Sequence, residues 1–186
     1  MSASLRSLVS PPAAGFDQPF EMLQACHERM QRTLDLLVRL RSHLREHGGD
    51  LQAQQAARDV MRYFDLAAPQ HHRDEELHVF PPLLARGDER LRSTIVRLQQ
   101  DHVAMEAGWK SAREVLARVA EGGASRLAEA HEAALEAFVS LYGEHIAIEE
   151  ELAYPAARQL LDADALASAG AEMARRRGAD PDPARR

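Results

Sequence analysis

Two stretches of the chain share a pattern of residue types that can bind a metal ion. In each stretch a histidine is followed four residues later by a Glu-Glu pair, and an aromatic residue and a proline close the pattern. The first copy covers residues 71–81 and the second covers residues 145–155, an offset of 74 positions. Phe64 and Phe138 each lie seven residues before the histidine of their copy, which extends the repeat upstream. The chain therefore contains two related segments with the same side-chain chemistry.

A histidine and a glutamate four residues apart lie on one face of an α-helix. The pair His71 and Glu75 therefore presents an imidazole and a carboxylate to one interior point. The pair His145 and Glu149 does the same in the second copy.

Two further histidines stand alone on the apolar stripes of two other predicted helices. His27 lies on a stripe within residues 20–44, and His102 lies in the middle of a stripe within residues 91–119. Both stripes advance in steps of three and four residues, which is the period of a helix with one buried face. We therefore expect both histidines to point into the core.

Burying carboxylates without partners costs many kcal/mol, so they must be paired, protonated or bound to a metal ion. No Lys or Arg occupies these stripes near the histidines and glutamates. Imidazole and carboxylate donors suit iron, with manganese and zinc as compatible alternatives. The composition of the site matches two metal ions bridged by Glu75 and Glu149, each with two histidines. The candidate ligands are His27, His71, Glu75, His102, His145 and Glu149.

Two neighbouring histidines offer alternative spacings. His72 also has a glutamate four residues later, but Ile146 stands at the corresponding position of the second copy, so the repeat favours His71. The spacing Glu75-x-x-His78 occurs in ferritin-like di-iron proteins. A second copy of that spacing is absent, so we interpret His78 as a flanking residue.

The elements that position these residues are predicted to be helices. Alanine, leucine, glutamate and arginine dominate, and aromatic residues make up only 5%, a composition typical of helical bundles. Short links at residues 48–50, 87–88 and 122–123 separate four helical patterns, and short links favour antiparallel neighbours. The sequence thus predicts an all-α, up-down-up-down antiparallel four-helix bundle, with a short extra C-terminal helix after Asp162. Pro69 predicts a break or kink in the second helix.

The chain is expected to divide into three segments: a flexible N-terminal arm at residues 1–16, the bundle at residues 17–161, and a short helix with a disordered, solvent-exposed basic tail at residues 162–186. The net charge of −6 disfavours a nucleic-acid partner. The single Cys26 cannot form an internal disulfide, which fits a reducing compartment. No apolar run reaches the length of a membrane span. We therefore expect a cytoplasmic protein with no membrane partner.

The six candidate ligands, in their order along the chain, resemble those of the hemerythrin-like (HHE cation-binding) family. Phe80-Pro81 and Tyr154-Pro155 strengthen the resemblance, which covers residues 17–161. It implies a four-helix bundle that holds two non-haem iron ions with an oxo or hydroxo bridge. It also implies a vacant position where dioxygen or another small molecule binds.

The chain departs from the oxygen-carrying members of this family at one position. Those proteins have a second histidine four residues after the histidine of the third helix, whereas here Glu106 follows His102 at that spacing. Glu106 is compatible with a role as an additional metal ligand, as a partner of a ligand, or as a bystander near the site. The substitution disfavours reversible oxygen carriage.

The resemblance and this departure together favour a di-iron protein that binds dioxygen, nitric oxide or peroxide in sensing or a stress response. A sensing role would require a protein partner. The alternative is a redox, enzyme-like role in nitric oxide or peroxide detoxification, or iron delivery for iron–sulfur cluster repair. Iron storage is disfavoured because the ferritin motif is incomplete. A monomer and a homodimer are both compatible with the sequence.

Overall fold

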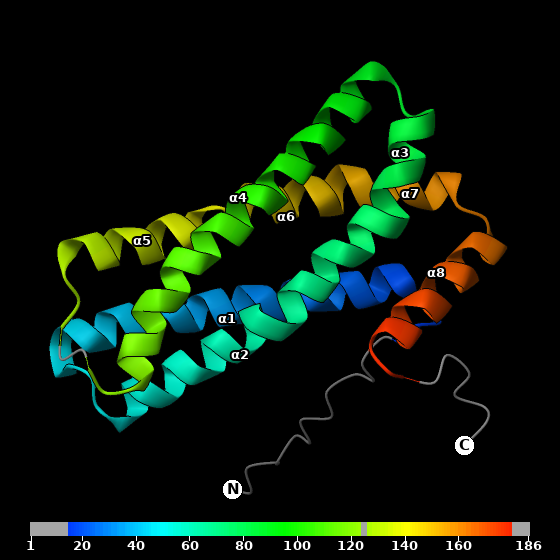
Figure 1. Cartoon of the computed structure of the whole chain (residues 1–186). Helices are drawn as coiled ribbons and strands as arrows, with labels where there is room; N and C mark the ends of the chain where they lie inside the picture. The colour runs from blue at the N-terminus through cyan, green and yellow to red at the C-terminus, as the bar shows by residue number, and fades with distance from the viewer. Residues whose placement is uncertain (1–14, 124–125, 180–186) are drawn as a thin grey trace, which may run out of the picture.

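The computed structural model describes residues 15–123 and 126–179, and these residues form helices joined by turns, without strands (Figure 1). The predicted all-α fold class is therefore confirmed. The arm expected at residues 1–16 and the tail expected within residues 162–186 fall largely on residues 1–14 and 180–186, which lie outside the described residues.

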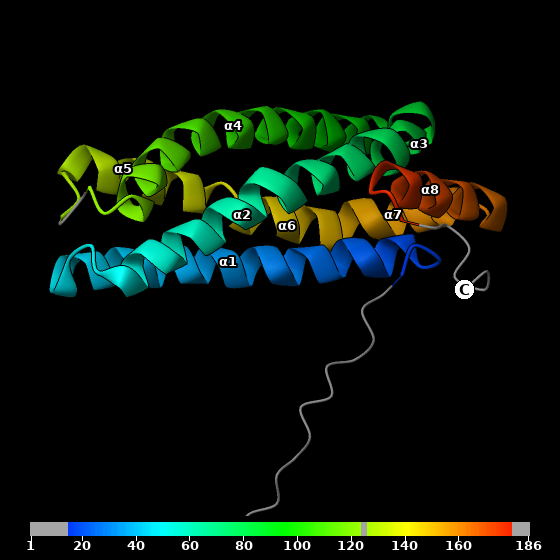
Figure 2. The same ribbon diagram turned by 60° about the horizontal axis from the view of Figure 1, so that its bottom comes forward.

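The described helices form four rods, each made of one helix or of consecutive helices in line, and an additional helix at one end of the molecule (Figures 1 and 2). The first rod is α1 (Pro19–His47). The second consists of α2 (Leu51–Asp74), the π-helix η1 (Glu75–Val79) and α3 (Phe80–Arg86). The third is α4 (Glu89–Ala120). The fourth consists of α5 (Glu129–Ser140), α6 (Gly143–Ile148), the π-helix η2 (Glu149–Ala153) and α7 (Tyr154–Leu160). The additional helix is α8 (Ala163–Arg176).

The rods pack side by side as a helical bundle. Helix α1 contacts α2 and α5, while α4 contacts α2 and α5 from the other side. Aspartate side chains begin three of the helices: the carboxylates of Asp50, Asp88 and Asp162 each accept a backbone N–H three residues on. Such caps satisfy amide groups that have no partner within the helix. The links predicted at residues 48–50 and 87–88 and the helix predicted after Asp162 are thus confirmed.

The break expected at Pro69 is absent, because α2 runs through this residue without interruption. The irregular turns lie further along the chain. They are the π-helices η1 and η2, which precede Pro81 and Pro155. A proline clashes with the carbonyl four residues earlier in a regular helix. A turn widened by one residue before the proline relieves this clash, and such wide turns occur often at functional sites. The second and fourth rods share this irregularity because they share the repeated sequence.

The fourth rod was expected to be one helix, but it is interrupted between Ser140 and Gly143. The amides of Leu141 and Tyr142 bond the carbonyls three residues earlier, which tightens the chain locally. Gly143, a weak helix former, begins the next helix. His145 therefore lies in the first turns of a new short helix.

The apolar core consists of two clusters, one on each side of the histidine and glutamate residues. On α1, Leu23 belongs to one cluster and Met30 to the other, with His27 between them. On α4, Leu98 and Met105 flank His102 in the same way. The polar residues therefore form a layer across the bundle between two apolar regions.

Helix α8 is joined to the second rod by ion pairs. Asp74, which is fully buried, lies 2.9 Å from Nη1 of Arg176 and 2.5 Å from Nη2 of Arg177. A buried carboxylate needs such partners. The expectation that the C-terminal arginines are solvent-exposed is therefore wrong for these two, which place α8 against the segment that carries the first His/Glu motif.

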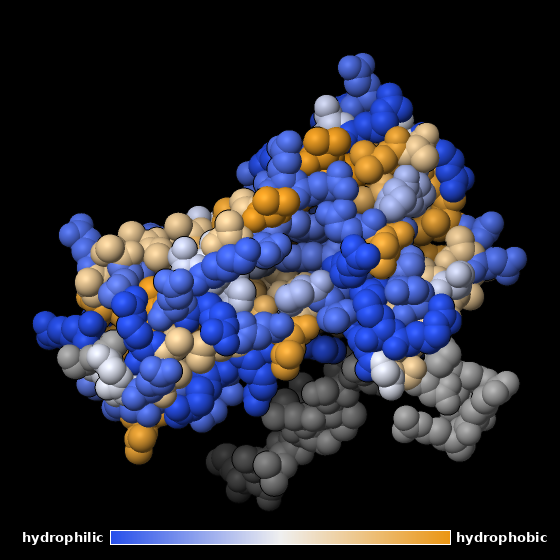
Figure 3. Space-filling model, in the orientation of Figure 1, coloured by the Kyte–Doolittle hydropathy of each residue, from blue (hydrophilic) through white to orange (hydrophobic). Residues whose placement is uncertain are grey.

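The face of the molecule in Figure 3 is mostly hydrophilic, and hydrophobic side chains gather around α3 and the adjoining end of α4. Among the described residues, no helix is both long and apolar enough to cross a membrane.

The close packing of α8 on the start of α1 provides a test of this arrangement. A Cβ atom at Gly170 would lie 1.8 Å from the carbonyl oxygen of Phe16, whereas one at Gly143 would meet nothing within 4 Å. We expect Gly170→Ala to lower the free energy of unfolding by about 1–3 kcal/mol because the backbones must separate. Gly143→Ala should raise it by about 0.5–1 kcal/mol. Thermal melts of the two variants measure the difference, and equal midpoints would contradict the packing of α8.

Candidate metal centre

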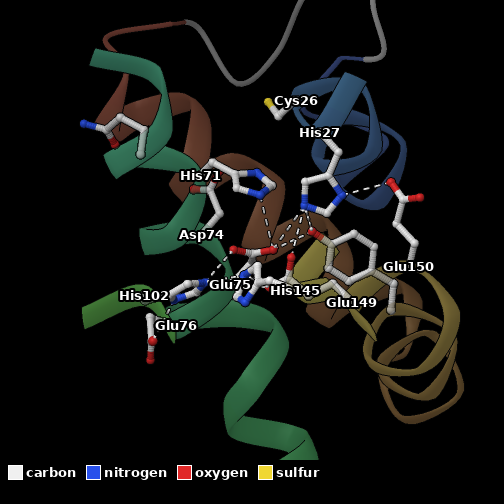
Figure 4. A network of polar contacts seen from close by, with 12 residues as sticks. Cys26, His27, His71, Asp74, Glu75, Glu76, His102, His145, Glu149 and Glu150 are labelled. Atoms are coloured by element: carbon white, nitrogen blue, oxygen red, sulfur yellow. Dashed lines mark hydrogen bonds and ion pairs between the residues drawn. The ribbon is translucent and has the colours of Figure 1, made fainter. Parts of the chain in front are cut away.

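The side chains predicted as ligands meet in the layer between the two apolar clusters (Figure 4). They come from all four rods, and each is at most 7% exposed. The helices that supply them are α1, α2 with η1, α4, and α6 with η2, in the order His27, His71 and Glu75, His102, His145 and Glu149.

Each of the two glutamates directs one oxygen to each half of the cluster. Oε2 of Glu149 lies 3.1 Å from Nε2 of His27, and its Oε1 lies 3.0 Å from Nε2 of His145. Oε1 of Glu75 lies 3.3 Å from Nε2 of His71, and its Oε2 lies 3.5 Å from Nε2 of His102. This is the arrangement that two bridging carboxylates require.

The donor atoms form two groups that share Glu149. One group consists of His27, His71, Glu75 and Glu149, and the other of His102, His145 and Glu149; within each group the donor atoms lie within 4.8 Å of one another. We refer to them as the His27 position and the His102 position. Each is small enough for its donors to converge on one ion.

Several buried atoms of the cluster have no hydrogen-bond partner of good geometry. They are Nδ1 of His71, Oε2 of Glu75 and both carboxylate oxygens of Glu149. Buried polar atoms are almost always satisfied, so an unpaired set needs an explanation. A cation between the donors would satisfy the carboxylate oxygens, so the residues fit a metal site.

The protein environment separates the proton affinities of the two glutamates. Burial, and then the charge of Glu149, raises the pKa of Glu75 well above its usual range. Burial alone would also raise the pKa of Glu149, but contacts with the imidazoles of His102, His145 and His27 hold it well below its usual range. A proton at this cluster is therefore bound more favourably by Glu75 than by Glu149.

Burial favours the neutral forms of two groups near Glu75, the imidazole of His71 and the phenol of Tyr154. Burial, followed by the charge of His27, lowers the pKa of His71 well below its usual range. Burial, followed by the charges of Glu75 and Glu149, raises the pKa of Tyr154 well above its usual range. A neutral imidazole is the form that binds a metal ion.

A second ring of carboxylates orients the histidines. Oε1 of Glu150 lies 2.9 Å from Nδ1 of His27, and Oε1 of Glu76 lies 3.1 Å from Nδ1 of His102. When a carboxylate holds Nδ1–H, the imidazole directs the lone pair of Nε2 toward the ion. The second glutamate of each repeated Glu-Glu pair therefore holds the lone histidine of a neighbouring rod.

Sequence reasoning missed this role, although the repetition of the second glutamate was a visible signal. Asp101, which lies 3.3 Å from Nδ1 of His145, was also missed, and it has no counterpart in the repeat that could have indicated it.

Three other residues considered in the sequence lie outside the cluster. Glu106 is on the surface, its side chain 72% exposed and its Oε1 2.9 Å from Nζ of Lys110. His78 lies 2.7 Å from Glu172 of α8. His72 stacks on His102 at 4.1 Å between ring centroids. The structure thus does not bring Glu106 to the other six candidate ligands.

A pocket of about 400 Å³ between α2 and α4 reaches the cluster at His102. Its walls are mainly apolar and aromatic, with Phe64, Trp109 and Tyr142 among them. Arg73 and Gln99 add polar groups. A small molecule in this pocket would contact the imidazoles of His72 and His102.

Comparison with known proteins agrees with this geometry. Residues 18–157 match the family model of the hemerythrin HHE cation-binding domain. The chain belongs to this family. It is also similar to an uncharacterized protein of Haemophilus influenzae, with 31% identity over 164 residues, which cover 88% of this chain and 92% of that protein. The family membership and the buried His/Glu cluster together suit a metal-binding protein.

The orienting role of the second glutamates leads to a test. We expect Glu150→Ala to weaken the binding of a divalent metal ion by about 10–100-fold, because the ring of His27 is no longer held in place. Glu150→Gln should lose less, since its amide oxygen still accepts a hydrogen bond. Competition with a chromophoric chelator measures the affinity. Glu151→Ala, at the exposed neighbouring position, is the control, and an equal affinity in the two alanine variants would refute the role.

Proposed function

We propose that the protein is a non-haem di-iron protein that binds dioxygen, nitric oxide or peroxide in sensing or a stress response. In this proposal His27 and His71 bind one iron, His102 and His145 bind the other, and Glu75 and Glu149 bridge them. The proposal includes an oxo or hydroxo bridge between the ions. It omits Glu106 as a ligand, because that side chain is exposed and paired with Lys110.

The observation that carries the proposal is the orientation of the two buried carboxylates. Each directs one oxygen to either half of the cluster, and three of their four oxygens lack a good hydrogen bond. A single ion would leave part of this set unsatisfied, whereas two ions use all of it. Imidazole with carboxylate is a donor set that suits iron, and manganese and zinc are compatible with it. Bound iron would supply the ability to bind a diatomic molecule and to exchange electrons.

The proposed route for the small ligand is the pocket beside His102. This position has a pocket wall on one side. The phenyl and indole groups of Phe64 and Trp109 provide an apolar environment for a neutral diatomic molecule. His72, stacked on His102, lies between the pocket and the cluster.

A second candidate function is redox turnover of nitric oxide or peroxide, or iron delivery for iron–sulfur cluster repair. The polar part of the pocket favours turnover over storage of a ligand, because Arg73, Glu76 and Gln99 admit water close to His102. A carrier of dioxygen needs a dry site instead.

The further elements of the proposal are a bundle at residues 17–161 with up-down-up-down order, a cytoplasmic location, and a protein partner if the role is sensing.

Metal content tests the proposed ligand set. We expect anaerobic loading with ferrous iron to give two equivalents per chain. His71→Ala and His145→Ala should each lose at least one equivalent, because each removes one of the two histidines that bind its ion in this proposal. His131→Ala is a suitable control, since His131 contacts Arg118 far along the fourth rod. Elemental analysis after desalting gives the numbers, and full occupancy in both ligand variants would sink the assignment.

A variant that fills the pocket tests the route of the ligand. Ala68 is a buried wall residue, and its neighbour Ala67 lies on another part of the α2 surface. We expect Ala68→Leu to lower the association rate constant of azide with the iron-loaded protein by roughly tenfold, because the larger side chain narrows the pocket. The matched variant Ala67→Leu should bind azide at the native rate. Stopped-flow absorption measures both, and equal rates at unchanged iron content would exclude this route.

A further inference from the structure

The repeated motif places an aromatic ring on each lone histidine, and the two rings differ by one hydroxyl group. Phe80 stacks on His102 with 5.5 Å between ring centroids and 21° between planes. Tyr154, the corresponding residue of the second copy, stacks on His27 at 5.5 Å and 7°. The two halves of the site are therefore alike in shape, but only the His27 position has a phenol.

The hydroxyl of Tyr154 lies among the donor atoms of that position. Its oxygen is 2.5 Å from Oε1 of Glu75 and 3.2 Å from Nε2 of His27. The side chain is almost completely buried, so the hydroxyl has no access to bulk water. The hydroxyl donates a hydrogen bond to Oε1 of Glu75, and this bond satisfies that carboxylate oxygen.

The distance of this oxygen from Nε2 of His27 is close to the distances between the recognised donors. Nε2 of His27 lies 3.1 Å from Glu149, and Nε2 of His71 lies 3.3 Å from Glu75. Neighbouring ligands at right angles around an ion with bonds of about 2.1 Å lie about 3 Å apart. An ion that reaches His27 and Glu75 is therefore within reach of the phenol oxygen.

We propose that Tyr154 is a metal ligand, binding as a phenolate to the ion at the His27 position. This inference rests on the proposed iron binding and adds a fifth donor residue to His27, His71, Glu75 and Glu149. On coordination the O–H bond of Tyr154 is replaced by an oxygen–metal bond, and the proton leaves the hydroxyl through its hydrogen bond to Glu75 and passes from there to solvent. No oxidant or reductant takes part in this step.

The consequence is a pair of unlike metal positions. The His27 position has an additional anionic oxygen donor, which favours the ferric over the ferrous state because it adds negative charge at the ion. The His102 position has a phenyl ring in the equivalent place and adjoins the pocket. Exogenous ligands are thereby directed to the His102 position, while Tyr154 closes the other.

A ferric phenolate has a signature that other ligands of this site lack. The protein loaded with two irons and oxidised should show a strong visible charge-transfer band, with phenolate ring modes enhanced in the resonance Raman spectrum. Tyr154→Phe should remove both while the protein retains two irons, because Phe80 shows that a ring without a hydroxyl fits this environment. The chain contains three tyrosines, so Tyr63→Phe and Tyr142→Phe are complete controls and should leave the band unchanged.

The outcomes separate this inference from the proposed function. Two irons per chain without phenolate modes in the native protein would overturn the role of Tyr154 and leave the di-iron assignment intact. The same holds for a band that survives in Tyr154→Phe. Failure to bind iron at all would overturn both. The reciprocal variant Phe80→Tyr provides a second measurement, since a hydroxyl at the His102 position should add a second ferric phenolate and intensify the band.

Discussion

Two carboxylates in the middle of a helical bundle impose the main constraint on this structure. Glu75 and Glu149 are fully buried, and isolated buried charges are far too costly to persist. The imidazoles around them reduce this cost. Outside them, Glu76 and Glu150 fix the imidazoles from the opposite side. The layer is thus an alternation of acids and bases that a cation at its centre would complete.

This constraint determines how the core is divided. Apolar side chains cannot satisfy the layer, so they pack above and below it as two separate clusters. The π-helices belong to the same solution, because each begins at a buried glutamate and widens the backbone there. Asp74 of α2 is a third buried carboxylate, directly before Glu75 in the chain, and Arg176 and Arg177 at the end of α8 neutralise it. Buried ion pairs therefore characterise the part of the bundle against which α8 packs.

The repeated motif allowed the rods and the six clustered residues to be predicted, since helical periodicity determines which side chains share a face. The irregularities were less predictable. Pro69 predicts an interruption of the second helix, yet α2 continues through this residue. Glu106 has the spacing of a ligand, but its side chain is exposed and pairs with Lys110 one turn further along α4. The partners of Asp74 lie about a hundred positions away in the chain, and no local pattern indicates such a contact.

The reach of the cluster along the chain has a consequence for the unfolded state. His27 and Glu150 are in contact although 123 positions separate them, and the other donors lie between these ends. Joining such distant points restricts the unfolded chain as a cross-link does, and the entropy of closing a loop grows only slowly with its length. The two proposed ions, bound together by side chains of all four rods, would therefore act as a reversible cross-link between the rods. The metal affinity would depend on assembly of the whole bundle, and metal binding would in turn raise the free energy of unfolding of the bundle.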